Sequence, residues 1–157
     1  MRKQPNSAWC VICGVENVGG VQVAFYDTAD ADGRPEVLAR FVGRSCHQGY
    51  PGRMHGGLVT GILDETIGRA VNSGRDGETV WGVATELTVR FRQPVPLDVE
   101  LTARGRLDRD NRRLFEGHGE IYLPDGTPAA TATGKYVKMP LDQISGIDPD
   151  ELGWRVY

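Results

Sequence analysis

The sequence lacks the features that mark several common classes of protein. No apolar run approaches the roughly 20 residues that a membrane-spanning helix needs, so we expect no membrane partner. Positive charge is not in excess, since 18 lysines and arginines face 21 aspartates and glutamates, so we expect no nucleic-acid partner. The opening residues 1–9 are polar and lack the apolar core of a signal peptide, which predicts a cytoplasmic location.

Cysteine is also scarce, with only Cys10, Cys13 and Cys46. An odd number of cysteines in a chain without an export signal argues against a disulfide framework. Cys10 and Cys13 have the spacing of metal ligands, and Cys46 with His47 would complete the four that a zinc site needs. No second pair with this spacing supports zinc, and reduced thiols packed in a strand or turn are the alternative. We therefore predict no metal and no cofactor.

What the sequence does contain is typical of one globular domain. Its 157 residues are 39% hydrophobic and 25% charged, as in an ordinary folded protein. We interpret residues 1–157 as a single domain with a core over about 20–139, an N-terminal lead over 1–19 and a C-terminal tail over 140–157. The 21 glycines and nine prolines imply frequent turns, which suit a strand-rich fold.

One segment differs from the rest because its apolar residues recur at helical spacing. Residues 57–71 contain no proline, and their apolar stripe is wide enough to predict one long buried helix. A charged turn is expected over 108–111, and Asp148-Pro149 would open a short helix in the tail. The whole order predicts an α+β fold in which an antiparallel sheet wraps around the long helix. Alternating residues and turn signals predict strands over 20–26, 36–42, 79–93, 97–107, 112–123 and 127–139.

The start of the helix carries the first candidate for chemistry. Gly56 and Gly57 let a ligand approach the backbone, and the first N–H groups of a helix have no partner within it. With the positive end of the helix dipole, they would stabilise a carbonyl oxygen that gains negative charge. A glycine pair that only permits a tight turn is the alternative. His55 would shape the loop or carry a proton, while His47 and Gln48 lie where the loop would meet a carbonyl or water.

A carboxylate in the middle of the helix is the second candidate. Asp64 lies among apolar and glycine positions, where a charge is costly without a partner or a task. Burial would raise its pKa toward the range of a general base. Glu65 precedes Arg69 by four residues, which is the spacing of a surface ion pair. We therefore prefer Asp64 as the functional carboxylate.

The spacing of these candidates bears on assembly. Gly56 and Asp64 are eight residues apart, which is about 12 Å along one helix, so both cannot reach one small reacting group. Two antiparallel helices about a two-fold axis would bring Asp64 of one chain near Gly56 of the other. Gly61 and Gly68 would let such helices approach closely. The spacing therefore predicts a homodimer with shared active sites.

These residues resemble the hotdog-fold acyl-CoA thioesterases, in particular the PaaI-like branch, which is similar to the phenylacetate-degradation thioesterase. Residues 10–14, with their cysteine-glycine pattern, resemble the opening of that branch, and the likeness covers about residues 10–139. The resemblance rests mainly on His55-Gly56-Gly57, on Leu63-Asp64-Glu65 with Gly68, and on the strand 85–91 followed by Pro94-Val95-Pro96.

The resemblance implies a five- or six-stranded antiparallel sheet around a central helix, paired as dimers or tetramers. It implies that the Gly56 N–H polarises a thioester carbonyl, aided by Gly57, and that the partner subunit's Asp64 acts as base on water or as nucleophile. His47 and Glu65 are further candidates for contacting substrate. The substrate would be an aryl- or fatty-acyl-CoA, and we expect no cofactor because coenzyme A is part of the substrate. A thiolate leaves easily, so the reaction does not require a strong general acid.

Two positions depart from the family pattern. Gly49 stands where characterised members often have asparagine, and Ala84 where many have serine or threonine. Gln48 is a substitute for the first, and Thr85 lies beside the second, although it should point to the opposite strand face. The phosphates of coenzyme A call for basic groups, and a solvated charged strand face is the alternative explanation of such residues. The candidates are Arg90, Arg92, Lys135 and Lys138.

Two other functions are kept as alternatives. A hotdog enoyl-CoA hydratase or dehydratase also pairs a loop histidine with a helix carboxylate, as His47 with Asp64 or Glu65 would do. A non-catalytic acyl-CoA-binding module is favoured by Gly49 and Ala84, because neither supplies the polar side chain that is usual there.

Overall fold

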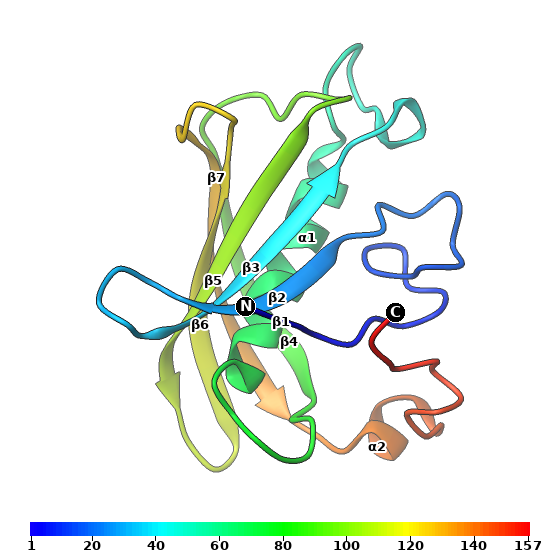
Figure 1. Ribbon diagram of the computed structural model, residues 1–157, viewed down its shortest axis with the longest axis vertical. Coiled ribbons are helices and arrows are strands. Elements are labelled where there is room, and N and C mark those ends of the chain that lie inside the picture. Colours follow the sequence, from blue (N-terminus) through cyan, green and yellow to red (C-terminus); the bar gives the residue numbers. More distant parts are fainter.

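The computed structural model describes all 157 residues, and its main feature is a seven-stranded antiparallel sheet that curves around one helix (Figure 1). The helix α1 covers Gly56–Arg69 and continues as a 3-10 turn over Ala70–Asn72. This arrangement confirms the predicted α+β architecture. No helix has both the length and the apolar character needed to cross a bilayer. The strands are β1 (Arg2–Lys3), β2 (Ala24–Ala29), β3 (Pro35–Val42), β4 (Gly82–Phe91), β5 (Glu100–Asp110), β6 (Leu114–Tyr122) and β7 (Pro128–Lys138), in the sheet order β1-β2-β3-β5-β6-β7-β4.

The core lies between α1 and the concave face of the sheet. Each aliphatic side chain that α1 buries in this core stabilises the fold by roughly 1.5–3 kcal/mol. Glycines on the strands let the helix approach: a Cβ at Gly105 would lie 2.5 Å from the Thr66 carbonyl oxygen, and one at Gly119 would lie 2.9 Å from Ile67 Cγ1. The side chains that α1 buries at helical spacing are those of Val59, Ile62, Leu63 and Ile67.

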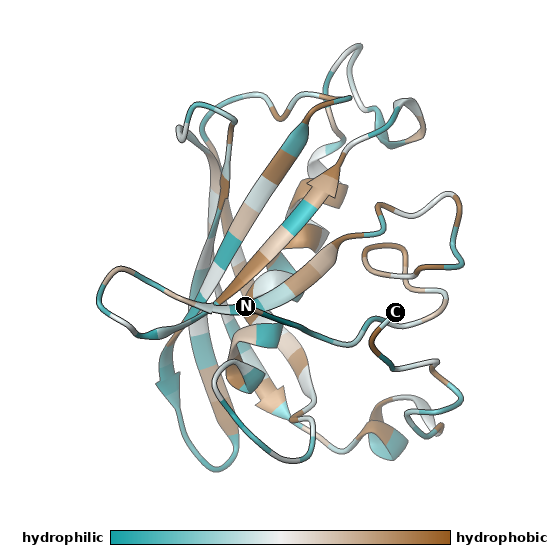
Figure 2. Ribbon diagram, in the orientation of Figure 1, coloured by the Kyte–Doolittle hydropathy of each residue, from teal (hydrophilic) through white to brown (hydrophobic).

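Strand residues alternate between the core and the outer face, as the hydropathy colours of Figure 2 show along the strands. On β6, Phe115 and Ile121 point inward and are fully buried, while the residues between the inward positions are partly exposed. The alternation explains why the strand prediction from the sequence succeeded for most of the sheet.

The first long strand and one turn differ from prediction. The sheet pairs residues 24–29 rather than 20–26, because Gln22 has a φ of 58° that breaks the extended chain. The segment before the strand instead bonds to the N-terminal loop, with the Val23 N–H donating to the Ile12 carbonyl at 2.9 Å. The expected turn over 108–111 is also wrong, because β5 continues to Asp110 and the chain turns after it.

The C-terminal tail is folded differently from the expectation. The short helix is α2 (Leu141–Ser145), which ends at Gly146 with a φ of 69°. Asp148 precedes a turn over residues 149–153 and not a helix, and its side chain accepts a hydrogen bond from the Glu151 N–H at 2.9 Å. The tail then returns to the N-terminal segment, where the backbones of Asn6 and Arg155 exchange hydrogen bonds of 2.8 and 3.1 Å. The two terminal segments therefore lie side by side (Figure 1).

The two edges of the sheet are unequal. The outer edge of β2 is covered by the N-terminal segment, through β1 and through the Gln4 N–H, which donates to the Phe25 carbonyl at 2.9 Å. At the opposite edge lies β4, and none of its ten residues is buried. Val83 and Phe91 on this strand are 38% and 59% exposed. The sheet thus has one covered edge and one long open edge with apolar side chains.

Candidate active site

The amino end of α1 presents a single free amide. His55 is the N-cap, and its Nδ1 accepts a hydrogen bond from the Gly57 N–H at 2.9 Å, so the ring proton lies on Nε2. The Gly56 N–H has no hydrogen-bond partner in the chain. Sequence reasoning named both glycines as donors, but Gly57 is occupied by the capping histidine. The Gly56 N–H is therefore the backbone donor that is free to form a hydrogen bond to a carbonyl oxygen.

This free amide opens to a cavity of about 740 Å³ at the amino end of α1, which we call the amide cavity. Of the predicted basic residues, Arg92 lines it. The exposed rings of Tyr50 and Phe91 also lie there. Gly49 contributes no side chain to this cavity, and the Phe91 ring would lie 3.5 Å from a Cβ at Gly56. The cavity therefore combines a backbone donor with an apolar and cationic rim.

Asp64 opens to a different cavity, of about 470 Å³, which we call the carboxylate cavity. The Tyr136 hydroxyl, from β7, lies 2.9 Å from Asp64 Oδ1 and 2.9 Å from its carbonyl oxygen. Burial raises the pKa of Asp64, and the hydrogen bond from Tyr136 opposes that rise. Because the hydroxyl bonds to Oδ1, Oδ2 is left for another partner. The cavity is also lined by Gly57, Gly61, Gly68, Gly82 and Ala84.

Tyr136 is a site residue that sequence reasoning missed. It lies 72 positions from Asp64 in the sequence, and its alternation in the strand marks only a core residue. Its ring stacks on Phe115 with a centroid distance of 4.8 Å, which fixes the hydroxyl against the helix. Burial, followed by the charge of Asp64, raises the pKa of Tyr136, so its hydroxyl stays protonated as a donor.

Glu65 forms the predicted ion pair with Arg69, but the pair is not at the surface. Glu65 Oε1 accepts from Arg69 Nη2 at 2.7 Å and from Nε at 3.0 Å, and the two side chains are 21% and 6% exposed. The Arg69 guanidinium lies over the rings of Phe25, at 4.0 Å, and Trp154, at 4.8 Å. Burial raises the pKa of Glu65 to about 7 despite Arg69. The terminal segments cover this helix face, which the spacing alone did not reveal.

Two loop residues named as candidates hold the loop itself. His47 is buried; its Nδ1 accepts from the Arg44 N–H at 3.0 Å, and its Nε2 lies 3.1 Å from the Gly19 carbonyl oxygen. No ring nitrogen is left for substrate. Gln48 Oε1 accepts from the Gly52 N–H at 2.9 Å, and neither His47 nor Gln48 lines the two cavities. Both residues position the chain ahead of α1.

The candidates on the strands are mostly engaged elsewhere. Thr85 lies at a β-bulge and donates to the Lys135 carbonyl at 3.2 Å, and it lines neither cavity. Lys135 lies 3.4 Å from the Glu86 carboxylate, and Lys138 lies 2.6 Å from that of Asp110. Arg90 is exposed on β4 outside both cavities. Arg92 is therefore the only one of the four predicted phosphate-binding residues beside the Gly56 amide.

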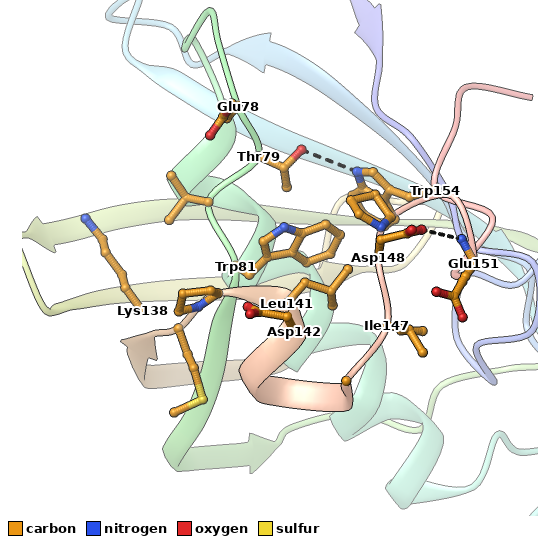
Figure 3. A pocket seen from close by; sticks show the side chains of 15 residues that line it. Glu78, Thr79, Trp81, Lys138, Leu141, Asp142, Ile147, Asp148, Glu151 and Trp154 are labelled. Carbon is orange, nitrogen blue, oxygen red and sulfur yellow. Dashed lines mark hydrogen bonds between the residues drawn. The ribbon is translucent and has the colours of Figure 1, made fainter.

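An aromatic wall bounds the carboxylate cavity on the side of the C-terminal segment. Trp81 and Trp154 have ring centroids 4.8 Å apart and are tilted by 56°, and Trp154 Nε1 donates to Thr79 Oγ1 at 3.4 Å. Figure 3 shows this pair in the adjoining cavity of about 920 Å³, with Leu141 of α2 close by. Both tryptophans line this adjoining cavity and the carboxylate cavity. Sequence reasoning gave no signal for this wall, because its two members lie far apart in the chain.

The geometry therefore offers an unpaired backbone donor and a partly buried carboxylate on one helix. A donor at a helix terminus stabilises developing negative charge on a carbonyl oxygen, and a carboxylate of raised pKa accepts a proton from water. In one chain these two groups open to separate cavities.

Comparisons with known proteins find related sequences and structures. Residues 51–130 match the family model described as the thioesterase superfamily. The chain is 28% identical over 133 residues to acyl-coenzyme A thioesterase THEM4 of Bos taurus, covering 84% of this chain and 52% of that protein. It is 26% identical over 129 residues to the Rattus norvegicus protein of the same name, covering 82% and 52%. The chain thus spans about half the length of the curated relatives it matches.

Solved structures show the same fold. A crystal structure of a thioesterase superfamily protein is 27% identical, with a TM-score of 0.68, over 82% of this chain and 62% of that one. A hypothetical thioesterase of Streptococcus pneumoniae, solved with coenzyme A, has a TM-score of 0.62 at 19% identity, over 74% of this chain and 88% of that one. Together with the sheet wrapped around α1, these likenesses confirm the predicted hotdog fold.

Proposed function

Because this chain belongs to the thioesterase superfamily, we propose that it hydrolyses acyl-coenzyme A thioesters to a free acid and coenzyme A. The observation that carries the proposal is that one helix holds both a free Gly56 N–H and a partly buried Asp64 carboxylate. The names of the relatives, and the coenzyme A in the Streptococcus pneumoniae structure, support this substrate class. The motif His55-Gly56-Gly57 supports the narrower placement in the PaaI-like branch.

In the proposed reaction, the Gly56 N–H donates to the thioester carbonyl oxygen and stabilises the oxyanion that forms. Asp64 accepts a proton from a water molecule through Oδ2, while Tyr136 holds Oδ1. The water oxygen bonds to the carbonyl carbon, and the tetrahedral intermediate then breaks its carbon–sulfur bond. A thiol has a pKa of about 8.5, so the thiolate departs without protonation by a strong general acid. Direct attack by Asp64, through an anhydride, is the second route.

We propose that two subunits share each site. Along α1, Gly56 and Asp64 are about 12 Å apart, and they open to separate cavities. A two-fold partner would place the partner subunit's Asp64 opposite Gly56. The open β4 edge supports such pairing, whereas Ile12 and Tyr136 of the same chain already pack against α1 at Gly61 and Gly68. Sedimentation of the active protein separates dimer from tetramer, and a purely monomeric active species would contradict the shared site.

The two cavities suggest where the parts of the substrate lie. The carboxylate cavity, with its tryptophan wall, would take the acyl group, whether aryl or aliphatic. The amide cavity, with Arg92 and exposed rings, would take the coenzyme A end. Arg92 is suited to a phosphate because its guanidinium offers two donors in one plane.

The deciding experiment is a panel of aryl- and fatty-acyl-CoA thioesters in which the released thiol is detected. We expect turnover of at least one class, and the preferred acyl group identifies the substrate. Binding of acyl-CoA with no thiol release across the panel would favour the non-catalytic module. Hydration of crotonyl-CoA without thiol release would favour the hydratase, against which the fully engaged ring of His47 already counts.

A further inference from the structure

A second cluster of reactive side chains lies at the carboxylate cavity and has no role in the proposed hydrolysis. Cys10 and Cys13 come from a turn in the N-terminal segment, and Glu65 comes from α1. The two sulfurs and a carboxylate oxygen of Glu65 all lie within 4.8 Å of one another. The cysteines are free, Cys13 is buried, and Cys10 lines the carboxylate cavity. Three ligand atoms of two chemical kinds thus converge on one point.

The separations suit a tetrahedral metal ion. Bonds of about 2.3 Å to sulfur and about 2.1 Å to oxygen at a tetrahedral angle put the two atoms about 3.6 Å apart. Cys10 Sγ and Glu65 Oε2 are 3.6 Å apart. The Ile12 N–H donates to Cys10 Sγ at 3.3 Å, a bond that favours a thiolate over a thiol. The Cys10–Glu65 separation therefore matches that of two ligands on a zinc-sized ion, and the Cys13 sulfur lies within 4.8 Å of both atoms.

The turn that carries the cysteines is held rigidly. The Gly14 N–H donates to the Cys10 carbonyl at 2.8 Å, and Asn6 Nδ2 donates to the Cys13 carbonyl at 2.7 Å. A Cβ at position 14 would lie 2.4 Å from the Cys10 carbonyl oxygen, so this turn requires glycine. A fixed backbone lowers the conformational cost of gathering ligands around an ion.

The surrounding charge also balances with an ion in place. Two thiolates and the Glu65 carboxylate carry three negative charges, which a divalent cation and the adjacent Arg69 guanidinium neutralise together. Arg69 bonds to Glu65 Oε1, whereas Oε2 faces the sulfur of Cys10. The arginine and an ion therefore use different oxygens. Binding would exchange two thiol protons for one divalent ion and leave the net charge of the cluster unchanged.

We propose that Cys10, Cys13 and Glu65 bind one divalent thiophilic cation of the zinc type, with the fourth position open to the carboxylate cavity. Soft sulfur ligands select such ions over magnesium or calcium. Cys46 and His47, which the sequence suggested as completing ligands, are excluded: Cys46 is exposed, and His47 uses both ring nitrogens elsewhere. The proposal does not depend on thioester hydrolysis, since binding is measured without substrate.

The test uses the full chain, reduced, stripped with a chelator and then loaded with Zn²⁺ or Co²⁺. We expect one equivalent of zinc per chain by elemental analysis after gel filtration. We expect Co²⁺ to give the intense thiolate-to-metal absorption of sulfur ligation. Cys10→Ser and Cys13→Ser should each abolish that absorption, and Glu65→Gln should weaken binding at least about tenfold. Cys46→Ser is the matched control and should bind like the unchanged chain.

Several results would overturn the proposal. These are zinc below about 0.2 equivalents per chain in the unchanged protein, or equal loss of cobalt absorption in Cys46→Ser. A disulfide between Cys10 and Cys13, seen as a loss of two hydrogens in mass after stripping, would do so if it persists under reductant and excludes metal. Thermal melting of Cys13→Ser verifies its fold, and if that variant fails to fold, Cys10→Ser on the cavity side decides the matter.

Discussion

The two cavities along α1 differ in what they offer a substrate. The amide cavity has an exposed rim and one uncommitted backbone donor, at Gly56. The carboxylate cavity is smaller and holds a proton acceptor, Asp64, whose position is fixed by Tyr136. One cavity can therefore stabilise negative charge, and the other can remove a proton. Under the proposed mechanism, a single chain would carry two half-sites, each of which needs the other for hydrolysis.

The sharpest test of the amide cavity is Gly56→Pro. Proline removes the free N–H, and the first helical position tolerates proline because that N–H has no helical partner. His55, with φ −62° and ψ 133°, already has the extended conformation that precedes proline. We expect thiol release to fall about 100- to 1000-fold, the usual effect of losing one oxyanion donor.

Gly56→Ala is the matched control, because it keeps the N–H. A Cβ at this position would lie 3.5 Å from the Phe91 ring, an ordinary contact. Steady-state kinetics should show nearly unchanged turnover for this variant. An equal loss in the alanine and proline variants would mean that shape, and not the amide, matters there.

The corresponding test of the carboxylate cavity is Asp64→Asn. The substitution keeps the size of the side chain and removes the proton acceptor, so we expect thiol release to fall at least about 100-fold. Sedimentation should show an unchanged assembly, and a non-hydrolysable thioether analogue of acyl-CoA should bind as before. Turnover like that of the unchanged chain would refute the role of Asp64.

Mixing the two inactive variants tests whether the half-sites belong to different chains. Random reassociation makes half of the dimers mixed, and each mixed dimer has one intact site of two, so we expect recovery to about a quarter of full activity. The gain is measured as thiol release after dissociation and reassociation of Gly56→Pro with Asp64→Asn. Absence of recovery, with exchange verified by mass labelling, would place both groups in one chain's site.

The smallest expected effect concerns the residue that orients the carboxylate. Tyr136→Phe removes a hydrogen bond to Asp64, which is worth about 1.4 kcal/mol, or about tenfold in turnover. Because Tyr136 acts through Asp64, kcat should fall while KM stays nearly constant. A rise in KM with kcat unchanged would instead assign Tyr136 to substrate binding.

The sequence was most informative where the argument was local. Helical spacing located α1 to within a residue at its start, and alternation located five of the six predicted strands approximately. A carboxylate on an apolar helix needs a partner or a task, and the structure gives Asp64 a partner in Tyr136, while its catalytic role stays a prediction. The first strand was misplaced because Gln22 breaks the extended chain, which no residue type at that position signals.

The rest of the candidate site depends on contacts between distant segments. The bond from Tyr136 to Asp64 spans 72 positions, and Arg69, the partner of Glu65, lies against Trp154 of the tail. The free state of the Gly56 amide also follows from a side-chain geometry, since His55 takes the Gly57 N–H instead. None of these contacts could be predicted from the spacing of residues along the sequence.

The unequal edges of the sheet limit how large an assembly can grow. An intermolecular β-sheet grows indefinitely only if each added molecule brings a second free edge strand with which another molecule can pair. Here the N-terminal segment blocks one side, and β4 is the single side available. When two copies join through β4, no template is left for a third, so this route of association stops at a finite particle and cannot propagate into a fibril.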